Sequence, residues 1–199
     1  TNGAQIFAMG TKNKPVIMTS EQDDLQTWRP SCHEWGNLTM LGDGLIAATL
    51  DGQGTGQPDG TDTAQMEGLV ARFEGDTLPI YGGGDDDDDS GVVQYVSLRY
   101  GGHVVSIANE LNGMSLGGVG RGTDLNYIEV FQNKDDGFEM FGGAASWKHS
   151  VVSNVGDDMY DYDEGWRGKA QFVFALQGIP ALGADQSDKG GEHDGGNDP

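Results

Sequence analysis

Two matched segments, each containing a pair of adjacent aspartates, recur 22 residues apart in this chain. The segments read YIEVFQNKDDGFEMF and HSVVSNVGDDMYDYD, so Asp135 and Asp136 correspond to Asp157 and Asp158. Repeats of about 20 to 30 residues, built from short strands and glycine turns, are typical of a parallel β-solenoid. In such a fold, each coil buries its inward side chains against the next coil.

The repeat extends beyond these aspartates. Glu139 corresponds to Asp161 and Phe141 to Asp163 at the same spacing. The segment SDKGGEHD forms a third copy, displaced by 31 residues, and the segment YVSLRYGG precedes YIEVFQN by 32 residues. In the third copy, the acidic positions are occupied by Asp188, Glu192 and Asp194.

Short runs of β-branched and aromatic residues, bounded by Gly, Asn or Asp, predict strands and no sustained helix. These runs are PVIMTS, GNLTMLG, VVQYVSLRY, LNYIEVF, HSVVSNV and AQFVFAL. A β-sandwich is the main alternative, but a sandwich has no reason to repeat Asp-Asp at matched positions. The predicted inward residues are Val96, Leu98, Met114, Leu116, Ile128, Val130, Phe138, Met140, Val152, Tyr160 and Phe172.

The length of 199 residues predicts one domain, residues 1–199, with loop insertions near residues 51–63 and 82–91. A formal net charge of −21 opposes direct binding to nucleic acid or anionic membranes. No apolar run reaches the length of a membrane span, and Cys32 as the single cysteine excludes an intrachain disulfide. The chain begins at Thr1 without a signal-peptide pattern, so we expect a mature or trimmed form.

The repeated acids predict a ladder of carboxylates along the solenoid. Equivalent positions in adjacent coils lie about 4.8 Å apart. Two negative charges at that distance repel by about 0.9 kcal/mol in water and about 3.5 kcal/mol at an effective dielectric of about 20. Carboxylate oxygens in a flexible, glycine-flanked chain are ligands that suit Ca²⁺, so the ladder predicts a calcium site. The alternative is that the ladder binds no metal and forms a charged sheet edge that discourages aggregation. The candidate metal ligands are Asp135, Asp136, Glu139, Asp157, Asp158, Asp161, Asp163, Asp188, Glu192 and Asp194.

Five consecutive aspartates, Asp85 to Asp89, form a second acidic cluster directly before a strand-like run. Asp86, Asp87 and Asp88 are therefore further candidate calcium ligands. Simple solvation of a surface loop is the alternative.

Other motifs give weaker signals. GMSLG, residues 113–117, matches G-x-S-x-G but lacks a following helix, so Ser115 is interpreted as an ordinary strand or turn residue. Cys32 and His33 lack a second pair of metal ligands. Trp166 and Arg167 are candidates for carbohydrate binding, since an aromatic face packs on sugar rings and Arg binds carboxylates. The alternative is that Trp166 caps a coil and Arg167 pairs with Asp163 or Glu164.

Several long segments resemble one family of exported Gram-negative bacterial proteins, described as secreted or lipoprotein-like β-helix proteins of uncharacterised function. The segments are EWGNLTMLGDG, GGGDDDDDSGVVQYVSLRYGG, DDMYDYDEGWRGKAQFVFALQG and the stretch from residue 109 to 149. The resemblance implies a right-handed parallel β-helix outside the cytoplasm, secreted or on the outer cell surface. It supplies no catalytic residues.

These observations favour a non-catalytic, calcium-stabilised β-helix module that acts in assembly or adhesion. Self-association, including fibre formation, and a cell-surface polysaccharide are the expected partners. The alternative is a calcium-dependent polysaccharide lyase, with a base or charge stabiliser drawn from Arg99, Arg121, Lys148 and Arg167. A carbohydrate-binding module is a third hypothesis.

Overall fold

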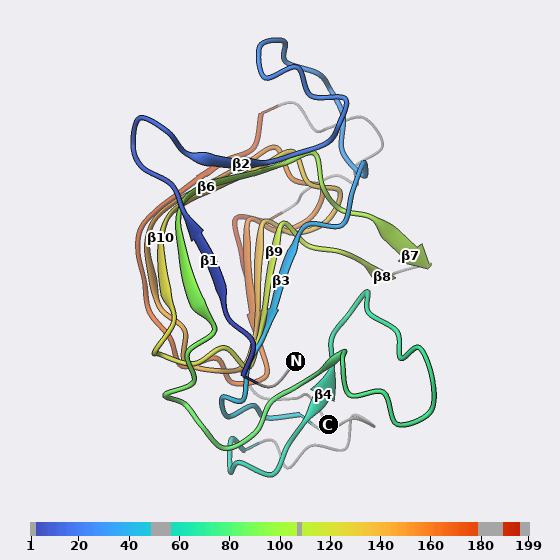
Figure 1. Ribbon diagram of the computed structural model, residues 1–199, viewed down its shortest axis with the longest axis vertical. Coiled ribbons are helices and arrows are strands. Elements are labelled where there is room, and N and C mark those ends of the chain that lie inside the picture. The colour runs from blue at the N-terminus through green and yellow to red at the C-terminus, as the bar shows by residue number, and fades with distance from the viewer. Residues whose placement is uncertain (1–2, 49–56, 107–108, 179–188, 196–199) are drawn as a thin grey trace.

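The protein is a right-handed parallel β-helix (Figure 1). The computed structural model describes residues 3–48, 57–106, 109–178 and 189–195. Within them, no helix is long and apolar enough to cross a membrane. The metal-ligand candidate Asp188 lies outside the described residues.

The larger sheet contains six parallel strands in which successive coils lie side by side. Its order is β1-β6-β10-β12-β14, and β2 also pairs with β6. The strands are β1 (Ile6–Met9), β2 (Val16–Met18), β6 (Gly91–Arg99), β10 (Asp124–Phe131), β12 (Trp147–Ser153) and β14 (Ala170–Leu176).

The second sheet contains five parallel strands and closes the coil. Its order is β15-β13-β11-β9-β3, formed by β3 (Leu38–Leu41), β9 (Met114–Gly117), β11 (Phe138–Phe141), β13 (Tyr160–Asp163) and β15 (Glu192–His193). Two small antiparallel pairs lie outside these sheets: β4 (Ala64–Gln65) with β5 (Ile80–Tyr81), and β7 (Val104–Ser106) with β8 (Asn109–Glu110). Parallel pairing between coils excludes the β-sandwich.

The core lies between the two large sheets. Nine of the predicted inward residues are buried in it, and Tyr160 packs against it, 5.6 Å from Phe138 between ring centroids. The prediction for Phe172 is wrong, because this side chain is 62% exposed. Strict alternation along the strand placed it inside, but its φ of 60° breaks that alternation.

Phe172 belongs to an aromatic column at a bend in the larger sheet. Tyr95, Tyr127 and His149 occupy the equivalent position in the preceding coils, and all four residues have φ between 50° and 60°. Their rings stack with centroid distances of 4.4, 4.3 and 4.9 Å along the column. The left-handed residues turn the strand, and ring stacking stabilises the bend.

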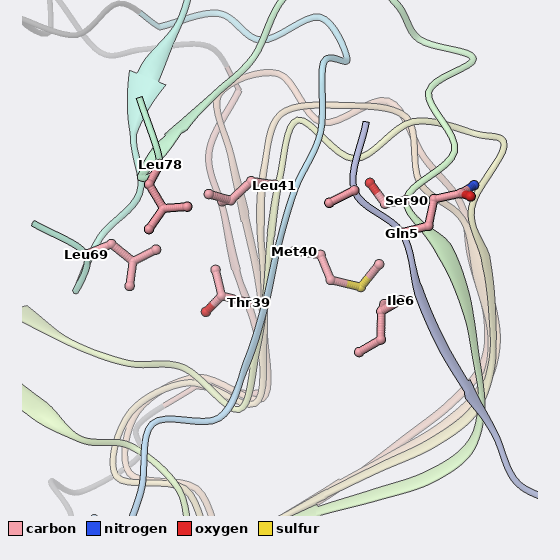
Figure 2. A pocket seen from close by; sticks show the side chains of 9 residues that line it. Gln5, Ile6, Thr39, Met40, Leu41, Leu69, Leu78 and Ser90 are labelled. Carbon is pink, nitrogen blue, oxygen red and sulfur yellow. The ribbon is translucent and has the colours of Figure 1, made fainter. Parts of the chain in front are cut away.

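Residues 46–48 and 64–81, which lie between β3 and β6 along the chain, cover the outer face of the second sheet, and residues 64–81 are called the covering segment. Ile46, Ala48, Ala64, Met66, Tyr81 and Phe141 form a second hydrophobic cluster there. Figure 2 shows Met40 of β3 directed toward Ile6, whereas Thr39 and Leu41 lie on the side of Leu69 and Leu78. These residues line a cavity of about 300 Å³ beside the first coil.

Candidate metal centre

The register of the second sheet aligns acidic side chains from successive coils. Glu139 pairs with Asp161, and Asp161 pairs with Glu192. Their neighbours Phe138 and Met140 belong to the core, so alternation places Glu139 on the outer face. The predicted alignment of Glu139 with Asp161 is therefore present.

The Asp-Asp turns also stack on each other. The backbone amide of Asp158 donates a hydrogen bond of 2.7 Å to Oδ1 of Asp136. Gly137 permits this close approach, because a Cβ there would lie 2.5 Å from the carbonyl oxygen of Met159.

Two groups of carboxylates share Asp136. One contains Asp135, Asp136 and Asp157, and the other contains Asp136, Glu139 and Asp161. Within each group, one oxygen from every residue lies within 4.8 Å of the others. Asp136 and Glu139 are buried, Asp161 is half-buried, and Asp157 is exposed.

Burial and mutual repulsion disfavour ionisation in the second group, which contains Asp136, Glu139 and Asp161 and is called the deeper group. Burial raises the pKa of Asp136 to about 9, and nearby Asp135, Asp161 and Asp157 contribute to the increase. Burial likewise raises the pKa of Glu139 well above its usual range. The pKa of Asp161 rises to about 7, mainly because of burial. Near neutral pH, each of these three carboxyl side chains therefore tends to hold a proton unless a positive charge lies beside it.

Three residues that the sequence analysis did not assign to the site also lie near it. Asn112 donates through Nδ2 to Glu139, and its Oδ1 accepts the amide of Asp136 at 3.2 Å. Ser115, paired in register with Glu139, is 1% exposed, and its hydroxyl has no hydrogen-bond partner. Glu67 belongs to the covering segment, and burial raises its pKa to about 7.

The local sequence offered a signal for two of these three residues. Asn112-Gly113-Met114-Ser115 has the same polar-Gly-apolar-polar order as Asp136-Gly137-Phe138-Glu139. In the structure these turns also stack, because a Cβ on Gly113 would lie 2.5 Å from the carbonyl oxygen of Gly137. Glu67 has no such signal, since it lies in a segment outside the repeats.

The remaining ladder candidates lie near the last described coil. Asp158 is buried, and its Oδ2 lies 3.7 Å from Nζ of Lys189; its pKa rises to about 6, chiefly through burial. Lys189 also pairs with Glu192. Burial raises the pKa of Asp163, whereas Asp194 is exposed.

The group of Asp136, Glu139 and Asp161 offers the kind of oxygen ligands that could hold a calcium ion. All its potential ligands are hard oxygens, and Ser115 adds a buried hydroxyl that has no hydrogen-bond partner. Oδ1 of Asp161 is likewise buried without a hydrogen-bond partner. Calcium accepts carboxylate and other oxygen ligands in flexible geometry, so Asp136, Glu139 and Asp161 fit this ion.

Two arginines pair with the five-aspartate loop and offset part of its negative charge. Asp86 accepts hydrogen bonds from Arg167 at 2.7 Å, Arg121 at 3.2 Å and the amide of Leu45 at 3.0 Å. Asp87 also pairs with Arg121, at 2.9 Å. Calcium binding by Asp86, Asp87 and Asp88 stays a prediction.

The carboxylate of Asp88, in the same loop, accepts hydrogen bonds from nearby residues. Its Oδ2 accepts a hydrogen bond from the hydroxyl of Ser90 at 3.0 Å. A longer contact of 3.4 Å joins the same oxygen to the amide of Gly120.

Trp166 and Arg167 have structural partners. The ring of Trp166 packs at the edge of the core, 5.4 Å from Trp147, and its indole nitrogen donates to the carbonyl of Ala145. Arg167 pairs with Asp86, which corrects the expected pairing with Asp163 or Glu164. The expected pairing assumed a local partner, but the fold brings the distant aspartate loop against this turn.

A separate buried carboxylate lies beneath the covering segment. Glu164 is 8% exposed, and its Oε2 accepts a hydrogen bond of 2.9 Å from the hydroxyl of Tyr81. Burial raises the pKa of Glu164 to about 7, although this hydrogen bond opposes the increase.

The comparison with protein families gives one match over nearly the whole chain. A family model described as "Pectate-lyase like beta helix domain" matches residues 1–198. No curated protein and no solved structure shows significant similarity to the chain.

Proposed function

Because the chain belongs to the family of pectate-lyase-like β-helix domains, we propose that it is a calcium-stabilised, non-catalytic β-helix module of an exported protein. It acts in assembly or adhesion at the outer cell surface or in the extracellular matrix. The resemblance to exported Gram-negative proteins supports this localisation. Self-association and a cell-surface polysaccharide are the proposed kinds of interaction.

The observation that carries this proposal is the group of the buried Asp136 and Glu139 with the half-buried Asp161. These carboxylates meet within 4.8 Å, and the buried Ser115 hydroxyl beside Glu139 has no hydrogen-bond partner. Without a cation, burial and repulsion oppose their ionisation. A bound Ca²⁺ removes this opposition and ties the successive coils β11 and β13 together.

The surroundings of the group favour a structural role. Among the largest influences on the pKa values of Asp136, Glu139 and Asp161, the charged groups are all carboxylates, with no lysine or arginine. A lyase requires a basic residue that faces the same groove as the calcium ligands.

The four basic residues considered for a lyase have contacts or positions that do not involve Asp136, Glu139 or Asp161. Arg99 lies 3.6 Å from Glu129 on the larger sheet, and Lys148 lies exposed on that same sheet. Arg121 and Arg167 pair with Asp86.

Calcium binding is tested by isothermal titration calorimetry and by thermal melting in millimolar calcium and in chelator. We expect measurable binding and a higher melting temperature in calcium. Asp161→Asn removes a carboxylate from the group and weakens binding. Asp124→Asn is the matched control, since Asp124 is an exposed carboxylate on the larger sheet. Equal melting temperatures in calcium and chelator would contradict the proposal.

The family description also supports the lyase as a second candidate. Incubation with a panel of uronate polymers, followed by ultraviolet absorbance of unsaturated products, distinguishes the two functions. Calcium binding without new absorbance supports the non-catalytic module. Calcium-dependent absorbance supports the lyase.

A further inference from the structure

We propose that copies of this chain stack head to tail, so that the last coil of one copy, with β14 and β15, pairs in parallel with the first coil of the next, with β1, β2 and β3. This inference rests on the self-association named in the proposed function and deepens it. It assigns the two surfaces that meet. Because these surfaces differ, the contact is heterologous, and repeating it extends the solenoid into a filament.

The last coil presents an open strand to solvent. All seven residues of β14 are exposed, and those at its centre are apolar: Phe172 is 62% exposed, Val173 45% and Phe174 57%. Ser150 of β12, the register partner of Val173 one coil earlier, is 1% exposed. A position that the stacked coils bury elsewhere is therefore open at this end.

The first coil presents a second apolar end. On β1, Phe7 and Met9 are each 63% exposed, and every residue of β2 is half-buried. The cavity of about 300 Å³ lies beside this coil, where Figure 2 shows Met40 directed toward Ile6. Apolar side chains and a hollow in the core are therefore both accessible at this end.

The strands at the two ends lack the features that normally prevent edge pairing. None of β1, β2 and β14 carries a charged residue, although the chain has a formal net charge of −21. Of the residues that the structure describes, none pairs as a strand with the edge of β14 away from β12, or with the edges of β1 and β2 away from β6. Monomeric proteins usually protect such edges with charges or a covering segment, and solenoids with polar terminal coils. Both ends are therefore suited to pairing with another strand.

The shape of the open edge identifies a second copy as the partner. The strands β6, β10, β12 and β14 bend at the aromatic column, which in β14 is at Phe172. The first coil turns at the same register position, since β1 pairs with β6 before Tyr95 and β2 pairs with it after Tyr95. A straight strand follows only part of such an edge. The first coil of another copy follows it on both sides of the bend.

Stacking in the register of the existing coils continues the core across the contact. Val173 occupies the position in the last coil that Val16 has in the first, and His193 occupies that of Met40. The exposed His193 stacks on Tyr162 with 4.5 Å between ring centroids. In the stack, Val173 meets Val16 of the next copy, and the other face of the His193 ring covers Met40 beside the cavity.

Sedimentation velocity and light scattering on the full chain, over a series of concentrations, test this inference. We expect the average mass to increase beyond that of a dimer, because each added copy leaves one end of either kind free. Val173→Asp and Val16→Asp each place an unpaired charge in the contact, so each should abolish association. Val151→Asp is the matched control and should associate as the unmodified chain does. Val151 is 39% exposed on β12, a strand that is paired on both sides.

A mixture of the two end variants tests the head-to-tail order. Val173→Asp keeps an unmodified first coil and Val16→Asp keeps an unmodified last coil, so together they should form a dimer of one copy of each and stop there. An unmodified chain that stops at a dimer, which Val173→Asp disrupts and Val16→Asp does not, would show two like ends in contact and refute the inference. The concentration series needs no variant, so a folding defect in Val16→Asp leaves the test intact.

Calcium titration of the same preparations separates this inference from the proposed calcium site. An unmodified chain that is monomeric at every concentration refutes the stacking, whether or not it binds calcium. Association that survives both end variants refutes the assigned surfaces, while self-association through another surface stands. Stacking without calcium binding refutes the calcium site alone. Both end variants should bind calcium as the unmodified chain does, because Val16 and Val173 lie on the larger sheet and the deeper group lies on the second.

Discussion

The amide of Asp158 donates a 2.7 Å hydrogen bond to the carboxylate of Asp136, its counterpart one coil earlier. The repeat is therefore also a physical contact between equivalent turns. This contact holds one oxygen of Asp136 toward the next coil. Asp136 also belongs to both carboxylate groups, so it is the residue around which the candidate metal centre is arranged.

Glu139→Gln should have opposite effects with and without calcium. In chelator, the variant should melt at the same temperature as the unmodified chain or higher, because it removes a buried acid whose ionisation the protein opposes. In calcium, it should lose most of the gain in melting temperature. Glu129→Gln, on the larger sheet, is the comparison. A large loss of stability in chelator would contradict this prediction.

The stability of the calcium-free protein should decrease as pH rises from about 5 to about 9. Asp136 and Asp161 have folded-state pKa values of about 9 and about 7, above those of an unfolded chain. The folded state therefore binds more protons across this range, and raising pH favours unfolding. Calcium binds the ionised groups, so its stabilising effect should grow with pH. Urea unfolding at several pH values, in calcium and in chelator, measures both trends.

Tyr81→Phe should destabilise the protein by about 1–3 kcal/mol, because it leaves the buried carboxyl of Glu164 without its hydrogen bond from the hydroxyl. The double variant Tyr81→Phe with Glu164→Gln should recover part of this loss, since it removes the buried acid. Free energies of unfolding from urea titrations test the coupling. Strict additivity of the two changes would show that the hydrogen bond contributes nothing.

Asp86→Ala should cost more stability than Asp87→Ala, although both residues belong to the same aspartate run. The Asp86 side chain is 15% exposed and joins Arg121, Arg167 and Leu45, whereas the Asp87 side chain is 77% exposed. We expect a loss of about 1–3 kcal/mol for Asp86→Ala and less than about 1 kcal/mol for Asp87→Ala. Equal losses in urea titrations would show that the network around Asp86 is energetically unimportant.

The repeats were sufficient to predict the fold and the register of the acidic residues. Matched spacing aligned Glu139 with Asp161, since parallel coils place equivalent residues side by side. Alternation failed at Phe172, because the strand bends through a left-handed residue there. The alternation of inward and outward side chains along a regular strand does not predict where the strand bends.

The buried character of the site was harder to predict. A carboxylate on the outer face of a solenoid is expected to be solvated, but the segment that contains Glu67 covers it. The partners of the aspartate loop were also missed, since Arg121 and Arg167 lie far along the chain from Asp86. Both features depend on how non-repeated segments fold back, and the spacing of the repeats does not describe this.

The most direct test of the central claim is a crystal structure of the protein soaked in calcium or in a lanthanide that replaces it, with the ion located by anomalous scattering. We predict a peak between β11 and β13, with oxygens of Asp136, Glu139 and Asp161 at about 2.3–2.6 Å from a calcium ion. Ordered, well-defined carboxylates with no peak between them would contradict the account.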